Sequence, residues 1–214
     1  YRAQVLTVYA PLTRLRAAHS NVEIESCSGG GGRIDFAMLR HTHRVWGSDC
    51  IDALSRVDIQ RGFGQFFPPE ILGSHIGTAP AHTTGRSQSL AFRAAVAMTG
   101  HLGVELDVRH LDSGTRQQLS AWIGRYKAWR DQIHHGHVWR GSGADGLVWQ
   151  AHGDEFADDV LLFVYRCEPT THRYTPALRL PMVDANSRYH VEQLAPIEGD
   201  GAVQSPAPFF ADLQ

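Results

Sequence analysis

The sequence lacks several features that mark particular classes of protein. Its three cysteines, Cys27, Cys50 and Cys167, are odd in number and widely spaced, which favours free thiols and a cytoplasmic location over a disulfide framework. The 20 Lys and Arg residues nearly balance 22 Asp and Glu residues, so no basic excess attracts nucleic acid or anionic membranes. The most apolar stretch, Val160–Tyr165, is far shorter than the roughly 20 residues of a membrane span. We therefore expect a neutral partner, with no nucleic acid and no membrane.

The 214 residues are 43% hydrophobic, which suffices for a sizeable core. Over residues 1–136, short apolar runs alternate with helical patterns, which predicts a parallel sheet. The expected strands are Val22–Cys27, Val45–Asp49, Ile71–Ile76 and a segment around His101–Asp107. The expected helices are Tyr1–Ala18, Cys50–Gly62, Ser87–Met98 and Ser113–His135. Because the chain opens at Tyr1 inside a helical pattern, we also expect it to be part of a longer chain.

The helix before Gly136 carries the clearest pattern, and Thr115 with Gln118 fits a capping box at its start. After Gly136 the helical pattern stops, and turn residues separate short apolar runs. The strands expected there are Leu147–Ala151, Val160–Arg166, Ala177–Met182 and Arg188–Leu194. The sequence therefore predicts two domains, an α/β unit over 1–136 and a small antiparallel β-domain over 137–214.

Four consecutive glycines, Gly29–Gly32, directly follow the first expected strand. The carboxyl end of a parallel strand is where α/β folds place their ligands, and glycines let backbone N–H groups approach a ligand closely. The alternative is a tight turn packed under another loop. A phosphate-binding loop is disfavoured, because the run matches neither of the glycine-rich phosphate motifs.

Three blocks in this order and spacing resemble the α-galactosidases of glycoside hydrolase family 36. They are Glu25-Ser-Cys-Ser-Gly-Gly-Gly-Gly-Arg-Ile-Asp35, Val45-Trp-Gly-Ser-Asp49 and Pro68-Pro-Glu-Ile-Leu-Gly-Ser-His75. The resemblance continues through Thr84-Gly-Arg86 and residues 98–107, so it covers about residues 1–110. It implies the C-terminal half of a (β/α)8 TIM barrel, followed by a small antiparallel β-sandwich over 137–214.

The resemblance also implies roles for four residues. Asp49 would be the acid/base, Cys27 and Gly30 would contact galactose hydroxyls, and Trp46 would line the sugar pocket. The nucleophilic aspartate of the family would lie just before Tyr1, so the missing N-terminal half of the same chain becomes an expected partner. As a proton donor, Asp49 would have to stay protonated near neutral pH.

Several residues in these blocks also have a purely structural interpretation. Ser48 or Asp49 could simply cap the helix that follows, and Asp52 is interpreted as a charge favoured by the helix dipole. Trp46 could be a core residue, since strict alternation along a strand sends it to the opposite face from Asp49 unless a bulge intervenes. His75 is interpreted as a core histidine, and the other histidine groups lack metal-ligand spacing, so no metal and no cofactor is expected.

The function expected from the resemblance is a retaining α-galactosidase that hydrolyses melibiose- or raffinose-type oligosaccharides, with the nucleophile encoded outside the 214 residues. The alternatives are a raffinose-type galactosyl transferase and a non-catalytic sugar-binding or assembly module, since the sequence supplies only one of the two carboxylates. The partner would be a galactose-containing oligosaccharide, and self-association into a homo-oligomer is common among such enzymes.

Overall fold

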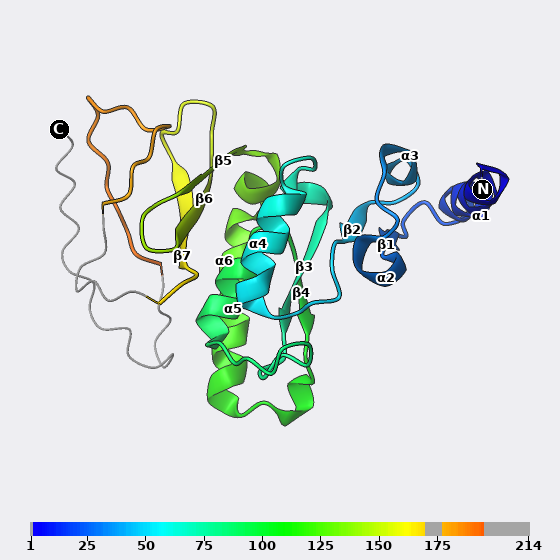
Figure 1. The fold of residues 1–214 in the computed structure, drawn as a ribbon, viewed down its shortest axis with the longest axis horizontal. Coiled ribbons are helices and arrows are strands. Elements are labelled where there is room, and N and C mark those ends of the chain that lie inside the picture. Colours follow the sequence, from blue (N-terminus) through cyan, green and yellow to red (C-terminus); the bar gives the residue numbers. More distant parts are fainter. Residues whose placement is uncertain (1, 170–176, 195–214) are drawn as a thin grey trace.

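The computed structural model describes residues 2–169 and 177–194 (Figure 1). These residues form one parallel and one antiparallel sheet with helices between them. The parallel sheet has the order β1-β2-β3-β4, and its strands are Glu25–Ser26, Arg44–Trp46, Leu72–Gly77 and His101–Glu105. The antiparallel sheet has the order β5-β6-β7, with strands His137–Ser142, Leu147–Gly153 and Val160–Arg166.

Helices connect the parallel strands, as the alternating pattern predicts. Between the strands lie α2 (Ser28–Gly31), α3 (Phe36–Leu39), α4 (Ala53–Phe63) and α5 (Leu90–Ala97), with a 3₁₀ turn at Pro69–Ile71. Helix α1 (Arg2–Ala18) precedes β1, and a 3₁₀ turn at Val108–His110 and α6 (Ser113–His135) follow β4. The first two strands are shorter than expected, because only two residue pairs join β1 to β2 and two join β2 to β3. The α/β class is confirmed, and the parallel sheet is open among the described residues.

Two helix starts differ from the expected caps. The carboxylate of Asp112 caps α6 by accepting the backbone N–H of Thr115 at 2.8 Å, so the expected capping box at Thr115 is wrong. Asp52 caps α4 by accepting the N–H groups of Leu54 and Ser55, as a charge at a helix start should. In both cases an aspartate lies directly before the first helical residue, where its side chain reaches the free N–H groups.

One hydrophobic core joins the two sheets. Helices α4, α5 and α6 lie between β3 and β4 on one side and the antiparallel sheet on the other (Figure 1). Ile76 of β3, Ala94 of α5 and Ile133 of α6 are fully buried, and Phe163 of β7 belongs to the same cluster. The element type changes between His135 and His137. The division into domains 1–136 and 137–214 stays a prediction.

Two arginines, one on β5 and one on α4, join the antiparallel sheet to the C-terminal end of α4. Arg140 of β5 donates from Nη1 to the carbonyl of Gly64 at 3.2 Å. Arg61 of α4 donates to the carbonyl of Gly141 at 2.9 Å and to the hydroxyl of Ser142 at 3.1 Å. A cation near the last carbonyl groups of a helix is favoured by the helix dipole. The C-terminal end of α4 is therefore fixed to β5.

The expected strands Ala177–Met182 and Arg188–Leu194 are wrong, because residues 177–194 contain no strand. The Asp184 carboxylate accepts the N–H of Asn186 and the hydroxyl of Ser187, which closes a local turn in place of a strand ladder. The rest of the predicted β-domain, residues 170–176 and 195–214, lies outside the described residues.

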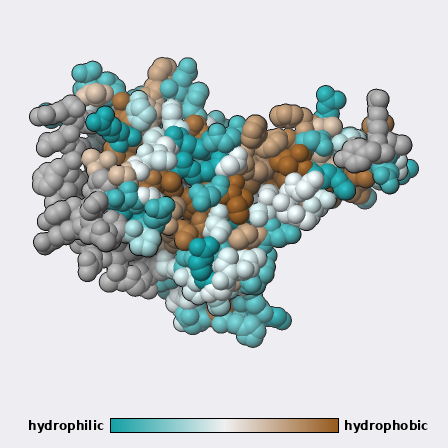
Figure 2. All heavy atoms as spheres, viewed as in Figure 1, coloured by the Kyte–Doolittle hydropathy of each residue, from teal (hydrophilic) through white to brown (hydrophobic). Residues whose placement is uncertain are grey.

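The surface mixes polar and apolar residues, as the balanced composition predicts, with hydrophobic residues gathered near the middle of the face shown in Figure 2. In residues 2–169 and 177–194, no helix combines the length and the hydropathy needed to cross a bilayer.

A fully buried histidine makes the stability of this fold dependent on pH. His152 of β6 donates from Nδ1 to the carbonyl of Ile133 at 2.9 Å, and its Nε2 accepts from the Gln150 amide at 2.7 Å. Burial lowers the pKa of His152 to about 4, although the bond to Ile133 opposes the shift. Above about pH 6.5 the imidazole of His152 is neutral in both the folded and the unfolded chain, so its protonation takes nothing from the stability there.

As the pH falls from about 6.5 to about 4, His152 becomes protonated in the unfolded chain but stays neutral in the folded chain. We expect urea unfolding to show a loss of about 3 kcal/mol across this window. His152→Asn should be less stable at neutral pH yet show a flatter pH dependence. An unchanged slope in this variant would assign the acid sensitivity to other groups.

Candidate active site

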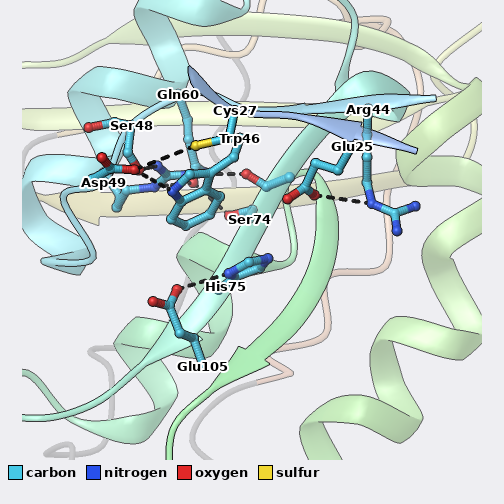
Figure 3. A network of polar contacts seen from close by, with 12 residues as sticks. Glu25, Cys27, Arg44, Trp46, Ser48, Asp49, Gln60, Ser74, His75 and Glu105 are labelled. Atoms are coloured by element: carbon cyan, nitrogen blue, oxygen red, sulfur yellow. Dashed lines mark hydrogen bonds and ion pairs between the residues drawn. The ribbon is translucent and has the colours of Figure 1, made fainter. Parts of the chain in front are cut away.

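The residues singled out in the sequence meet at the carboxyl ends of β1 and β2. Cys27 follows β1 directly, and the segment Gly47-Ser48-Asp49 follows β2. Because β1 and β2 pair in parallel, with Ser26 opposite Val45, both loops leave the same edge of the sheet. Figure 3 shows the side chains of Cys27, Trp46 and Asp49 converging there.

The glycine run forms a left-handed turn. Ser28, Gly29, Gly30 and Gly31 all have positive φ, between 62° and 93°, and the N–H of Gly31 donates to the carbonyl of Cys27 at 3.2 Å. Successive left-handed residues are strongly disfavoured for any residue with a Cβ, which explains why glycine recurs.

This turn packs against the loop that follows β2. A Cβ at Gly30 would lie 2.7 Å from the backbone nitrogen of Asp49, and one at Gly31 would lie 2.9 Å from the carbonyl oxygen of Gly47. The tight turn packed against another loop is therefore present. That loop carries Asp49, so the packing itself brings the glycine turn to the carboxylate.

The Asp49 carboxyl group is held by two donors on one oxygen. The indole N–H of Trp46 donates to Oδ1 at 3.1 Å, and the thiol of Cys27 lies 3.8 Å from the same atom (Figure 3). The carboxyl group is exposed. Asp49 does not cap α4, since Asp52 does, and Ser48 instead accepts the N–H of Cys50 at 3.2 Å.

The expectation that alternation separates Trp46 from Asp49 is wrong. It assumed a strand that runs to Asp49, but β2 ends at Trp46 and the loop turns back over the indole. Trp46 itself is buried, with 8% of its surface exposed, and its ring stacks on His75 with centroids 4.2 Å apart. It is thus both a packed residue and a direct contact of Asp49.

His75 is not the core histidine that the sequence suggested. About a quarter of its side chain is exposed, and its Nδ1 lies 3.0 Å from a carboxylate oxygen of Glu105 (Figure 3). In β3 and β4, His75 is opposite Gly103, and a Cβ there would lie 2.5 Å from the imidazole. His75 and Glu105 therefore continue the row of contacts that begins at Asp49 and Trp46 onto β3 and β4.

Two acidic residues at and just before β1 share one arginine partner. Arg44 of β2 binds Glu23 and also Glu25, with 3.2 Å between Nε and Oε2 in the second pair. The hydrogen bond and charge of Arg44 lower the pKa of Glu23. Ser26 is buried and donates to the carbonyl of Arg33, whereas Glu25 lies on the side of Gly73 and Trp46, as alternation predicts.

An ion pair between buried Asp52 and half-exposed Arg86 fixes the loop after β3 over the start of α4. Asp52 is fully buried and receives hydrogen bonds from Arg86 and Thr84. Burial alone raises the pKa of Asp52, but these hydrogen bonds outweigh it and lower the pKa. The sequence left Arg86 without a role, and this contact supplies one. Thr83 of the same loop lies 3.5 Å from the Cys50 sulfur.

Sequence reasoning missed Arg56, which lies under Trp46. Its guanidinium carbon is 4.4 Å from the ring centroid, and Nη1 donates to the carbonyl of Ser48 at 3.0 Å. The signal was present in the pattern, because Arg56 shares the buried face of α4 with Ala53, Val57 and Gln60. A charged residue on a helical stripe that otherwise faces the core indicates a specific partner. The described residues contain no cluster of three or more metal-ligating side chains.

Comparison with known proteins identifies close relatives. The family model described as "Melibiase" matches residues 1–136. An α-galactosidase of Escherichia coli is 40% identical over 191 residues, which are 88% of this chain and 27% of that protein. The α-galactosidase AgaA of Geobacillus stearothermophilus is 32% identical over 204 residues, which are 92% of this chain and 27% of that protein. The chain thus spans about a quarter of the length of these curated relatives.

Solved structures agree with this placement. The galactosidase domain of the α-galactosidase-sucrose kinase AgaSK matches with a TM-score of 0.79 and 34% identity, over 85% of this chain and 26% of that one. A variant of AgaA in complex with raffinose matches with a TM-score of 0.79 and 30% identity, over 84% of this chain and 25% of that one. The fold of the described residues is that of part of these proteins.

Two glycines offer a matched test of the loop contact. Gly29 and Gly30 have nearly the same positive φ, but a Cβ meets nothing within 4 Å at Gly29, whereas at Gly30 it meets the backbone of Asp49. Both Gly29→Ala and Gly30→Ala should lose about 1–2 kcal/mol from left-handed strain. Gly30→Ala should lose about 1–3 kcal/mol more, because backbone atoms must shift. Urea unfolding measures the difference, and equal losses would contradict the packing described here.

Proposed function

The chain belongs to the melibiase family, and we propose that it carries the acid/base half of the active site of a retaining α-galactosidase. Because the chain spans about a quarter of its relatives' length, the activity of the whole protein is part of the proposal. The observation that carries it is the Asp49 carboxyl group, held by Cys27 and Trp46 at the carboxyl ends of parallel strands. Barrel enzymes place their catalytic groups at these strand ends.

The proposal includes the architecture of the complete domain. Strands β1 to β4 would be the fifth to eighth strands of a (β/α)8 barrel, and α6 would close it. Their parallel order, with helices between them, supports this assignment. The face that carries Trp46, His75 and Glu105 would then line the interior of the barrel. Residues 137–214 would form the sandwich domain that follows the barrel in this family.

In the proposed first step, a carboxylate nucleophile attacks the anomeric carbon of a terminal α-galactoside. The bond to the leaving oxygen breaks as Asp49 gives that oxygen its proton. In the second step, Asp49 takes a proton from water, and the water oxygen displaces the enzyme carboxylate and restores the α configuration. The resemblance assigns the nucleophile to a strand before Tyr1, and the longer relatives leave room for such a segment.

The hydrogen bonds at Asp49 support a proton donor. The contacts from Trp46 and from Cys27 both fall on Oδ1, and in the proposal Oδ2 is the oxygen that carries the proton toward a substrate. In the proposal the thiol of Cys27 and the backbone of Gly30 bind galactose hydroxyls. Trp46 contributes an aromatic edge beside them. The two loops that carry these groups are in backbone contact, so their spacing is set before any sugar binds.

The remaining expectations enter as proposals as well. AgaA variants have been solved with raffinose and with stachyose, which supports a galactose-containing oligosaccharide as the ligand of this chain. The three cysteines are unpaired, which supports a reducing compartment such as the cytoplasm. Self-association into a homo-oligomer is proposed from the family resemblance alone.

Replacement of the proton donor should affect substrates according to their leaving groups. In the natural full-length protein, Asp49→Asn should lower kcat/KM for melibiose by about 10²- to 10⁴-fold, because a sugar oxygen must be protonated to leave. Dinitrophenyl α-galactoside needs no such help, so its kcat/KM should change by less than about 10-fold. Azide should accelerate turnover of the aryl substrate, since it attacks the glycosyl-enzyme without a base. Steady-state kinetics with both substrates measure these effects.

Asp58, an exposed carboxylate on α4, provides the matched control, and Asp58→Asn should leave both substrates unaffected. Equal losses on both substrates in Asp49→Asn would contradict the acid/base role. A wild-type protein that binds galactose but hydrolyses neither substrate would favour the sugar-binding module instead.

A further inference from the structure

A buried cation lies beneath the site and has no role in the mechanism above. Arg56 of α4 is 2% exposed. No carboxylate of the described residues lies within ion-pair distance of its guanidinium, although the charges of Cys50 and Glu105 act on it from farther away. Burial lowers the pKa of Arg56 to about 10. Burying a cation without an ion-pair partner is costly, so its contacts must serve a specific purpose.

The contacts of Arg56 lead to the two attachments of Asp49. Nη1 donates to the carbonyl of Ser48, the residue that precedes Asp49, at 3.0 Å. The guanidinium carbon lies 4.4 Å from the ring centroid of Trp46, whose N–H donates to Asp49 Oδ1. Nη2 donates to the carbonyl of Gly73 in β3 at 3.0 Å, which ties the arginine to the sheet.

We propose that Arg56 is a positioning residue for the proton donor. It holds the Ser48 carbonyl and the Trp46 indole at one guanidinium, and through them it fixes the direction of the Asp49 carboxyl group. The planar fork of arginine suits this task, because two donors reach two carbonyls while the flat face contacts a ring. The inference rests on the proposed function of Asp49 and adds a residue that never touches the sugar.

A neighbouring network shows what a purely structural role looks like. Gln60 donates to Thr99 at 2.7 Å and to the Val96 carbonyl at 2.9 Å, and it accepts from Ser74 at 2.6 Å. Figure 3 labels Gln60 and Ser74. These bonds join α4 to β3 and to the end of α5, and none of them reaches Ser48 or Trp46. Arg56 donates to Gln60 at 3.3 Å, so it also borders this network. A test must therefore separate loss of positioning from loss of packing.

The leaving group of the substrate makes that separation. In the natural full-length protein, Arg56→Met should lower kcat/KM for melibiose about 100-fold, since a small displacement of a catalytic group costs this much. For dinitrophenyl α-galactoside the loss should stay under about 5-fold, because departure of this group needs no proton. Azide should accelerate aryl turnover in Arg56→Met, as it should in Asp49→Asn.

Two further variants complete the design. Arg56→Lys keeps a cation but cannot donate to both carbonyls in the same geometry. Its loss of kcat/KM should be smaller than that of Arg56→Met and should again be confined to melibiose. Arg61→Met removes the same group five residues along α4, where the guanidinium binds β5 at Gly141 and Ser142. Any loss of kcat/KM in Arg61→Met should therefore be the same for melibiose and for the aryl substrate.

The outcomes are distinct. Equal losses on both substrates in Arg56→Met and Arg56→Lys, or no loss on either, overturn the positioning role while the proposed function stands. If Arg56→Met does not fold, as circular dichroism and thermal melting would show, Arg56→Lys decides by the same criterion. A wild-type protein that hydrolyses neither substrate overturns the proposed function itself.

Discussion

The site depends on the close contact between two loop backbones. Gly30 and Gly31 approach the segment 47–49 so closely that no side chain fits between them. Cys27 begins one of these loops and Asp49 ends the other, so the backbone contact sets the 3.8 Å between thiol and carboxylate. Left-handed backbone geometry makes the approach possible, and glycine adopts this geometry without steric strain because it has no Cβ. The polar groups meet because the backbones do.

Those parts of the site that follow from strand ends could be predicted from sequence. Asp49 and the glycine run each come after an apolar run, and parallel strands bring such loops to one edge. The bond between Trp46 and Asp49 could not be predicted, because it depends on β2 ending at Trp46. The helical pattern of α4 could have indicated a buried Arg56, but its partners could not be predicted, because they are two carbonyls and a ring surface.

The same distinction holds for the fold. Helix α6 spans the expected residues because its long apolar stripe outweighs local uncertainty at its ends. Its cap was misassigned to Thr115, because Asp112 lies three residues earlier and is an equally good capping residue. The strands expected within residues 177–194 fail where Asp184 offers the backbone a local turn. Long periodic elements were predictable, whereas local competition between side chain and backbone was not.

Helix α4 connects parts of the molecule that lie far apart in the sequence. Its first turn is held by the Asp52–Arg86 pair and its last turn by β5, over eleven residues or about 16 Å of helix. Arg56 lies between these two anchors and holds the Ser48 carbonyl. The helix therefore links the antiparallel sheet to the loop that carries Asp49. The two sheets are thus joined by polar contacts along one helix as well as by the hydrophobic core.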